Sequence, residues 1–169
     1  MQRRSFLKKG MFGGVLLVAG GATLGLSSTN MAFKPVRALK VFTERHFAIL
    51  ASIAARTVRI EGANPVEIAH AVDDVMSTAV PEAREDMKGL LLLFENALAG
   101  LLFDGRLKPF TQLSGEQQDK VLESWRDSRI LVRRGGYNAL RKLTLASYYA
   151  SPSSWEGVGY PGPPEIVTE

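Results

Sequence analysis

Apolar residues recur at helical spacing in five separate stretches of this chain, a pattern that limits it to an all-α fold. The first stretch follows Thr43, a favourable N-cap, and the second follows Asn64-Pro65, with Asn as the N-cap and Pro at the first helical position. A third runs from Glu82 towards Phe103, and Pro81 closes the helix before it. The sequence shows no β-strand alternation and no internal repeat. We therefore predict an irregular bundle of about five helices.

The third stretch is apolar on nearly all sides, so we predict that it forms the central helix of the bundle. Glu95 interrupts it and is expected on a solvent-facing side, a buried carboxylate with a raised pKa being the alternative. Ser114 and Gln117 form a capping-box pattern that starts a fourth helix. The segment 133–136, Arg-Arg-Gly-Gly, is predicted to be a hinge or helix junction before the fifth helix. The buried stripe of that helix is predicted to comprise Tyr137, Leu140, Leu143, Thr144 and Tyr148.

The composition changes after Ala150, where residues 151–164 are rich in Pro and Gly and are predicted not to be helical. This stretch carries Trp155, Val158 and Tyr160, and exposed aromatic side chains are costly unless something covers them. We expect it to lie as an extended strip on this domain or on a partner, with disorder as the alternative. The predicted organisation is a signal segment at 1–32, a helical domain at 33–150 and an extended docking tail at 151–169.

We interpret the first 28 residues as an export signal rather than as part of the folded domain. Their start combines a positively charged region with an uncharged, Gly-rich apolar segment from Met11 to Leu26, as in a signal peptide. The twin arginine and the residues after it indicate the bacterial Tat translocase, which moves folded proteins into the periplasm. The residues that carry this signal are Arg3, Arg4, Phe6, Leu7 and Lys8.

Two fates of the leader remain open. It is either cleaved or retained as a membrane anchor, since the uncharged run from Gly10 to Phe33 is long enough to cross a bilayer. The choice of a folded-protein exporter indicates that a cofactor or a partner subunit is assembled first.

Charge and cysteine content narrow the search for that cofactor. Four of the 21 Lys and Arg residues lie before position 10, so 17 remain to balance 17 Asp and Glu residues. The exported domain is therefore neutral, which gives no electrostatic case for nucleic acid. The chain has no cysteine, which excludes disulfides, Cys-ligated iron–sulfur clusters and covalently attached c-type haem.

The remaining candidates for chemistry are weak. His70 has Glu67 at i−3 and two aspartates, Asp73 and Asp74, at i+3 and i+4, so Glu67-x-x-His70 is half of a di-iron carboxylate motif. The other histidine, His46, has Thr43 where the second glutamate is needed, so we interpret the His70 cluster as a solvated charged face. Two basic pairs stand out, Arg133-Arg134 and Arg141-Lys142. We interpret them as a solvated basic edge, and the alternative is that they contact an acidic partner. The chain is not expected to be an enzyme on its own.

Three segments carry a family resemblance: FTERHFAILASIAART at 42–57, FTQLSGEQQDKVLESWRDS at 110–128 and ALRKLTLASYYASPSSWEGVGYPGPP at 139–164. With the twin-arginine leader in front of them, they resemble the gluconate 2-dehydrogenase subunit 3 family. Members of that family are small subunits of membrane-associated flavin sugar dehydrogenases, including the gamma subunit of bacterial FAD-dependent glucose dehydrogenase. The resemblance covers nearly the whole chain after the leader.

The resemblance implies a non-catalytic accessory subunit. In such complexes the small subunit supplies the Tat signal for a large FAD-containing oxidoreductase of the glucose–methanol–choline type, and a cytochrome c subunit often completes the electron path. FAD would then lie in the partner, with no cofactor in this chain, and the lack of cysteine makes the attachment non-covalent. The expected interface residues are Tyr149, Trp155, Tyr160, Pro161, Arg133 and Arg134. The alternatives are a stand-alone exported or membrane-anchored α-helical envelope or binding protein, and a metal-dependent enzyme that uses Glu67 and His70.

Overall fold

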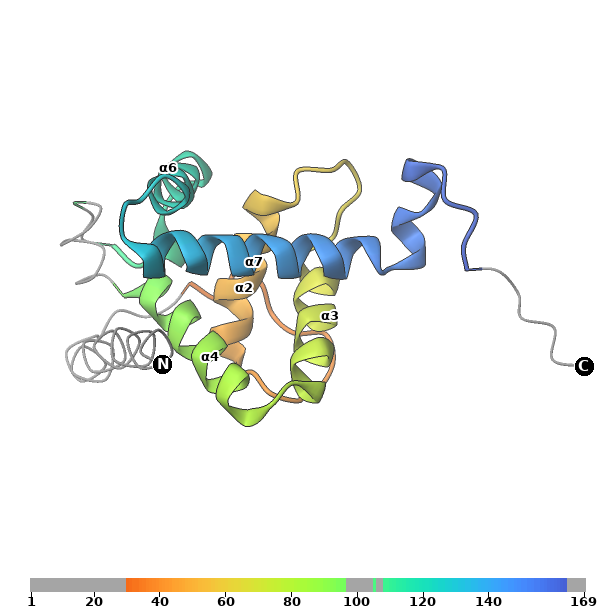
Figure 1. Ribbon diagram of the computed structural model, residues 1–169, viewed down its shortest axis with the longest axis horizontal. Coiled ribbons are helices and arrows are strands. Elements are labelled where there is room, and N and C mark those ends of the chain that lie inside the picture. Colours follow the sequence, from red (N-terminus) through yellow and green to blue (C-terminus); the bar gives the residue numbers. More distant parts are fainter. Residues whose placement is uncertain (1–29, 97–104, 106–107, 164–169) are drawn as a thin grey trace, which may run out of the picture.

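Five α-helices form the body of the described chain in a computed structural model that describes residues 30–96, 105 and 108–163 (Figure 1). The α-helices are α2 (Glu44–Thr57), α3 (Pro65–Thr78), α4 (Pro81–Glu95), α6 (Gly115–Arg126) and α7 (Leu131–Tyr149). Three short 3₁₀-helices are η1 (Phe110–Gln112), η2 (Pro152–Ser154) and η3 (Glu156–Val158). With helices and no strand in this part of the chain, the all-α prediction is confirmed. None of these helices is both long and apolar enough to cross a membrane.

Three predicted helix starts are confirmed by their caps. The Thr43 hydroxyl accepts from the backbone N–H of His46, and the His46 ring accepts from the Thr43 N–H, which closes a capping box. The Asn64 side chain accepts from the N–H of Val66, two residues on. The predicted capping box between Ser114 and Gln117 is also formed.

Of two predicted helix breaks, one is present and one is wrong. The break between α3 and α4 is present, but α3 already ends at Thr78, and Pro81 is the first residue of α4, a position where its missing N–H costs nothing. The segment 133–136 lies inside the continuous helix α7 and is no hinge. The described part of α4 ends at Glu95, and the predicted continuation to Phe103 falls outside the described residues.

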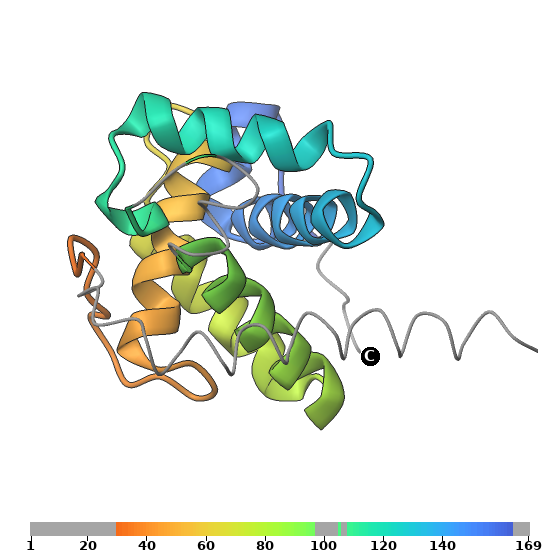
Figure 2. The same ribbon diagram turned by 90° about the vertical axis from the view of Figure 1, so that its left-hand side faces the viewer.

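The central helix is α2, not the Leu-rich α4. Every residue from His46 to Ala54 is buried, and α2 contacts α3, α4, α6 and α7. In α4 only Leu91, Phe94 and Glu95 are buried. Figures 1 and 2 show α7 crossing one side of α2 and α6 lying over the α2–α7 pair. Because its neighbours enclose α2 on all sides, α2 buries more residues than the Leu-rich α4 does.

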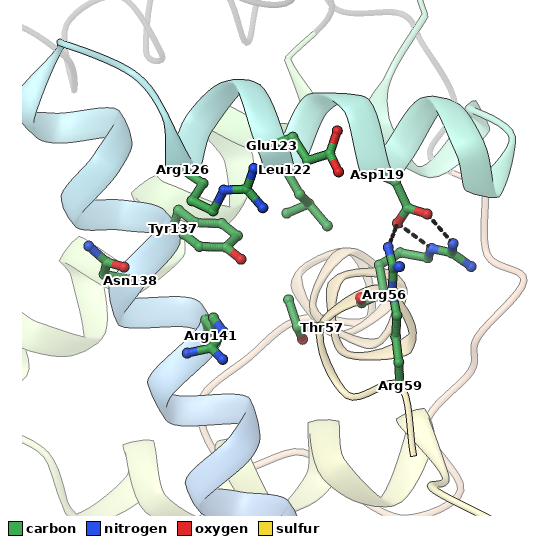
Figure 3. A pocket seen from close by; sticks show the side chains of 10 residues that line it. All are labelled: Arg56, Thr57, Arg59, Asp119, Leu122, Glu123, Arg126, Tyr137, Asn138 and Arg141. Carbon is green, nitrogen blue, oxygen red and sulfur yellow. Dashed lines mark hydrogen bonds and ion pairs between the residues drawn. The ribbon is translucent and has the colours of Figure 1, made fainter. Parts of the chain in front are cut away.

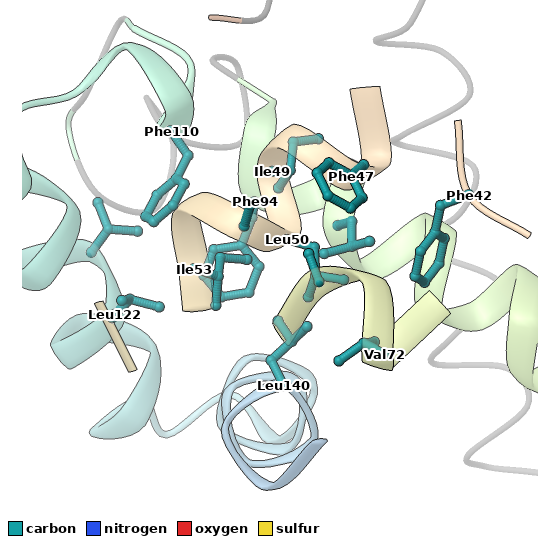
Figure 4. Packing of buried hydrophobic residues seen from close by; sticks show 14 of the residues in the cluster. Phe42, Phe47, Ile49, Leu50, Ile53, Val72, Phe94, Phe110, Leu122 and Leu140 are labelled. Atoms are coloured by element: carbon teal, nitrogen blue, oxygen red, sulfur yellow. The ribbon is translucent and has the colours of Figure 1, made fainter. Parts of the chain in front are cut away.

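The core packs around the junction of α2, α4, α6 and α7 (Figure 4). Phe94 stacks on Trp125 with ring centroids 3.8 Å apart, and Phe110 meets Phe94 edge-on at 5.8 Å. Such aromatic pairs add to the free energy gained by burying the rings. This arrangement also explains the glycine at 136: a Cβ there would lie 2.6 Å from Leu90 Cδ1 and 3.3 Å from the Trp125 ring. The bare backbone lets α7 approach the core.

Candidate partner-docking site

The C-terminal segment forms an ordered turn at the end of α7, rather than the predicted extended strip. Two 3₁₀-helices, η2 and η3, follow α7 directly, so the expectation of no helical structure after Ala150 is wrong in detail. Both are single turns, and Pro152 occupies the first position of η2. We call the surface built from Tyr149, Trp155, Tyr160 and Pro161 the aromatic turn.

Trp155 holds the aromatic turn together. Its ring N–H donates to the Tyr149 carbonyl at 3.1 Å, and its own carbonyl accepts from the Tyr160 N–H at 2.9 Å. The Trp155 and Tyr160 rings meet edge to face, 5.3 Å apart and inclined by 77°. Gly162, with φ of +104°, brings the returning chain against the Trp155 ring, where a Cβ would lie 3.2 Å away. The turn therefore folds on itself and remains attached to α7 through Tyr149.

The aromatic turn leaves apolar surface uncovered. Tyr149 is 44% exposed, Tyr160 46% and Val158 56%. The preceding residue, Tyr148, is directed inwards instead and packs on a small cluster formed by Ala54, Val58 and Ile68. Clustered exposed aromatics attached to an ordered backbone are a common feature of protein interfaces. The predicted interface residues Tyr149, Trp155, Tyr160 and Pro161 are thus brought together in one place.

The two basic residues predicted for the interface, Arg133 and Arg134, lie in different environments. Arg133 is buried, with its guanidinium 5.3 Å from the centre of the Trp125 ring and donating to the Ser124 hydroxyl at 2.9 Å. It therefore belongs to the packing of α6 against α7, and the interpretation as a solvated edge is wrong for this residue. Arg134 is exposed and donates to the Ser128 carbonyl at 3.0 Å.

The His70 cluster is not a solvated face. His70 is 1% exposed and accepts from the Val36 N–H at 3.1 Å. Asp73 is also 1% exposed and accepts from the backbone N–H groups of Lys40, Val41 and Phe42 at 2.6–3.0 Å. The two side chains thus fix the non-helical lead-in, residues 30–43, against α3. Within the described residues, no group of three or more His, Cys, Asp or Glu side chains is arranged to hold a metal ion.

The ionisable side chains of the His70 cluster are either neutral or paired with an opposite charge within the fold. Burial lowers the pKa of His70 and of His46, so both rings are neutral at pH 7. Asp74, on the exposed side of α3, pairs with Arg37 and Lys40, which hold the pKa of its carboxyl well below the usual range. The cluster is therefore structural.

Glu95 was predicted on a solvent-facing side, and this is wrong. It is 1% exposed and accepts from Thr111 twice, from the backbone N–H at 3.0 Å and from the hydroxyl at 2.6 Å. The Thr111 hydroxyl also accepts from the Asn30 N–H at 3.1 Å. Glu95 thus joins α4 to η1 and to the first described residue of the chain. Its position is explained by these bonds without any catalytic role.

Two polar grooves flank α7. The first, of about 480 Å³, lies between the end of α2, α6 and α7 (Figure 3). On one wall Asp119 receives the guanidinium of Arg56 through both oxygens and that of Arg59 through one, and the bond to Arg56 lowers the pKa of the Asp119 carboxyl. The second, of about 470 Å³, lies between α3 and the α7–η2 junction. Four arginines line the first groove: Arg56, Arg59, Arg126 and Arg141.

Sequence reasoning identified the aromatic residues but missed the buried roles of Asp73 and Glu95. No local signal marks these roles, because their partners lie 16 to 33 positions away. The predicted export signal, Arg3, Arg4, Phe6, Leu7 and Lys8, falls outside the described residues and stays a prediction.

Comparison with known proteins gives one match. The model of the family described as gluconate 2-dehydrogenase subunit 3 matches residues 45–162, from the start of α2 to the end of the aromatic turn. No curated protein and no solved structure matches the chain. The family takes its name from a subunit of a dehydrogenase complex. Because the match covers most of the sequence and the whole helical body, the chain belongs to the gluconate 2-dehydrogenase subunit 3 family.

Proposed function

We propose that this chain is the accessory subunit of a flavin-dependent sugar or alcohol dehydrogenase complex. It binds a large FAD-containing subunit of the glucose–methanol–choline type, supplies the Tat signal that takes both into the periplasm and stays bound there as a stabilising subunit. FAD belongs to the partner. The family match over residues 45–162 carries the proposal.

Two features of the chain support an escort role. The twin arginine at positions 3 and 4 heads a leader suited to export of a folded protein, which lets the partner acquire FAD before export. Of the exposed large apolar side chains of the described surface, Tyr149, Val158 and Tyr160 lie together at the aromatic turn. An escort needs binding surface rather than catalytic groups, and this turn provides it.

Co-expression with the flavin subunit of the same organism tests the proposal. We expect the two chains to co-purify in equal amounts, with FAD bound to the large subunit. We also expect less soluble, flavin-loaded large subunit when it is produced alone. Recovery of the two proteins as separate species, with equal flavin content in either case, would contradict an accessory role.

Substitution of Trp155 by alanine is expected to weaken this complex by about 2 kcal/mol, or roughly 30-fold in Kd. The indole both contacts the partner and holds the aromatic turn in place through Tyr149, Tyr160 and Gly162. Surface plasmon resonance with immobilised flavin subunit measures the change. Val80→Ala, which shortens another exposed apolar side chain at the start of α4, is the control and should bind normally. Unaltered binding by the Trp155 variant would exclude the aromatic turn from the interface.

A further inference from the structure

Several basic side chains of the described chain, all of them before Arg129, are matched by a carboxylate within the fold. Arg37 and Lys40 share Asp74, while Arg56 and Arg59 share Asp119. Other matched pairs are Lys88–Glu85, Lys120–Glu116 and Arg126–Asp127. The stretch from Arg129 to Trp155 differs, because it contains five basic residues and no Asp or Glu. Since the chain beyond the leader is neutral, this excess is a local feature and not a consequence of composition.

Four of the five basic residues in this stretch are exposed, Arg133 being the exception. On α7 these are Arg134, Arg141 and Lys142. Within the described part of the chain, none of the three forms an ion pair with a carboxylate. An acidic group of a partner can therefore pair with these three side chains without breaking an ion pair in the described part of the chain.

These side chains share one face of α7. A helix of 3.6 residues per turn brings positions 131, 134, 138, 141, 142 and 149 to the same side, opposite the buried Gly136, Leu140 and Thr144. Leu145 lies on the same side but packs half-buried against the core. We call the exposed part of this surface the cationic face of α7; it comprises Leu131, Arg134, Asn138, Arg141, Lys142 and Tyr149. It is about 27 Å long at 1.5 Å per residue. Figure 1 shows α7 crossing the front of the bundle, with α2 and α3 behind it.

The Arg-lined groove opens beside this face. Arg141 lines the groove together with Tyr137 and Arg126, and Figure 3 shows these three side chains around one hollow. Only two carboxylates, Asp119 and Glu123, line the same groove, and Asp119 is already engaged by Arg56 and Arg59. The volume of about 480 Å³ leaves room for a protruding acidic side chain. Arginine suits such a contact, because its planar guanidinium binds a carboxylate in bidentate fashion.

We propose that the cationic face of α7 docks onto an acidic surface of the large flavin subunit, and that an acidic side chain of this surface enters the Arg-lined groove. This inference rests on the proposed function and adds the chemistry of the partner surface. A positively charged face is complementary to an acidic partner surface. The cationic face of α7 is also continuous with the aromatic turn. Tyr149 belongs to both surfaces, and its carbonyl accepts from the Trp155 ring. One partner can therefore cover both.

The pattern of side chains favours a protein over an anionic lipid surface. A helix that lies in a membrane interface presents a continuous apolar stripe between its charged residues. On α7 the exposed large apolar side chains stand at the two ends of the face, at Leu131 and Tyr149, and the middle is cationic. Apolar anchors that flank complementary charges are a feature of protein interfaces, in which charge sets the association rate and the orientation.

The double substitution Arg141→Glu/Lys142→Glu tests the inference in the complex of the full chain with the flavin subunit. The association rate constant at low ionic strength is expected to fall about tenfold or more, because two attractive charges become repulsive. The wild-type rate should decrease as salt is raised to about 0.5 M, and the variant should lose most of this dependence. Arg141→Gln/Lys142→Gln removes the charges without reversing them and should give an intermediate rate.

The matched control is Lys34→Glu/Arg45→Glu. It makes the same change in net charge at two exposed residues, in the lead-in and in the first turn of α2, that have no ion-pair partner among the described residues. A rate loss confined to the α7 variants supports the inference. An equal loss in the control overturns it, because net charge alone would then govern binding. Circular dichroism confirms that the variants keep their helices.

Two further outcomes separate this inference from the proposed function. If the α7 variants bind normally while the Trp155 variant does not, the cationic face is not in the interface, although the proposed function stands. If wild-type chain forms no complex, the proposed function fails and this inference with it. Binding to vesicles of phosphatidylglycerol that is lost in the α7 variants, with unchanged binding to the flavin subunit, would identify a lipid surface as the occupant and overturn the inference.

Discussion

Replacement of Asp73 by alanine is expected to lower the free energy of unfolding by about 3 kcal/mol. The carboxylate is buried and accepts from three consecutive backbone N–H groups, of Lys40, Val41 and Phe42. An unsatisfied buried donor costs about 1–3 kcal/mol, and the half-buried N–H groups of Lys40 and Val41 can recover part of this loss by binding water, whereas that of Phe42 is buried. Urea unfolding followed by circular dichroism measures the change.

The neighbouring aspartate provides the control for this experiment. Asp74 follows Asp73 on α3 but forms exposed ion pairs with Arg37 and Lys40. Exposed pairs contribute little, so Asp74→Ala should cost less than about 1 kcal/mol. Equal losses for the two variants would show that Asp73 does not fix the lead-in. The distinction bears on the proposed function, because the lead-in, residues 30–43, directly follows the predicted export signal in the sequence.

The second large effect is expected at Trp125. Trp125→Ala should lower the free energy of unfolding by about 3–5 kcal/mol, as is usual when a large aromatic side chain is removed from a core. The ring stacks on Phe94, supports the Arg133 guanidinium and lies beside Gly136, so its loss opens a cavity where α4, α6 and α7 meet. Thermal and urea unfolding measure the loss.

The two tryptophans of the chain serve as controls for each other. Trp155 lies in the aromatic turn, outside the core, so Trp155→Ala should change the stability by less than about 1 kcal/mol while it weakens binding to the flavin subunit. Trp125→Phe keeps an aromatic ring against Phe94 and should retain much of the stability. If removal of Trp155 destabilises the domain as much as removal of Trp125, the aromatic turn is part of the core and its role as a binding surface is wrong.

The sequence predicts the helix starts well, because caps depend on residues next to one another. Thr43, Asn64 and Ser114 each satisfy an N–H within three positions, so no tertiary knowledge is needed. The aromatic turn was also recognisable in outline, since Trp155 and Tyr160 stand out in a Pro- and Gly-rich segment. Its compact shape was not, because it depends on a bond from the Trp155 ring back to Tyr149.

The errors have a common physical origin. His70 and Glu95 were assigned to solvent-facing sides from helical spacing, which cannot show that the lead-in or η1 covers those sides. The Arg-Arg-Gly-Gly segment suggested a break, yet packing overrides the low helix propensity of glycine, because Gly136 allows contact with Leu90 and Trp125. The cationic face of α7 likewise could not be defined from the sequence, because helical spacing does not show that Arg133 is buried while Arg134, Arg141 and Lys142 are exposed.

Export of the flavin subunit is the most direct test of the escort role. We would co-express the flavin subunit with the wild-type chain or with Arg3→Lys/Arg4→Lys, and measure FAD-dependent dye reduction in the periplasmic, membrane and cytoplasmic fractions. We expect activity outside the cytoplasm with the wild-type chain. With the double-lysine variant we expect an intact complex that stays in the cytoplasm, since the substitution alters the export signal and not the docking surfaces. Export of active flavin subunit with either chain would contradict the escort role, because the partner would then reach the periplasm without this chain's signal.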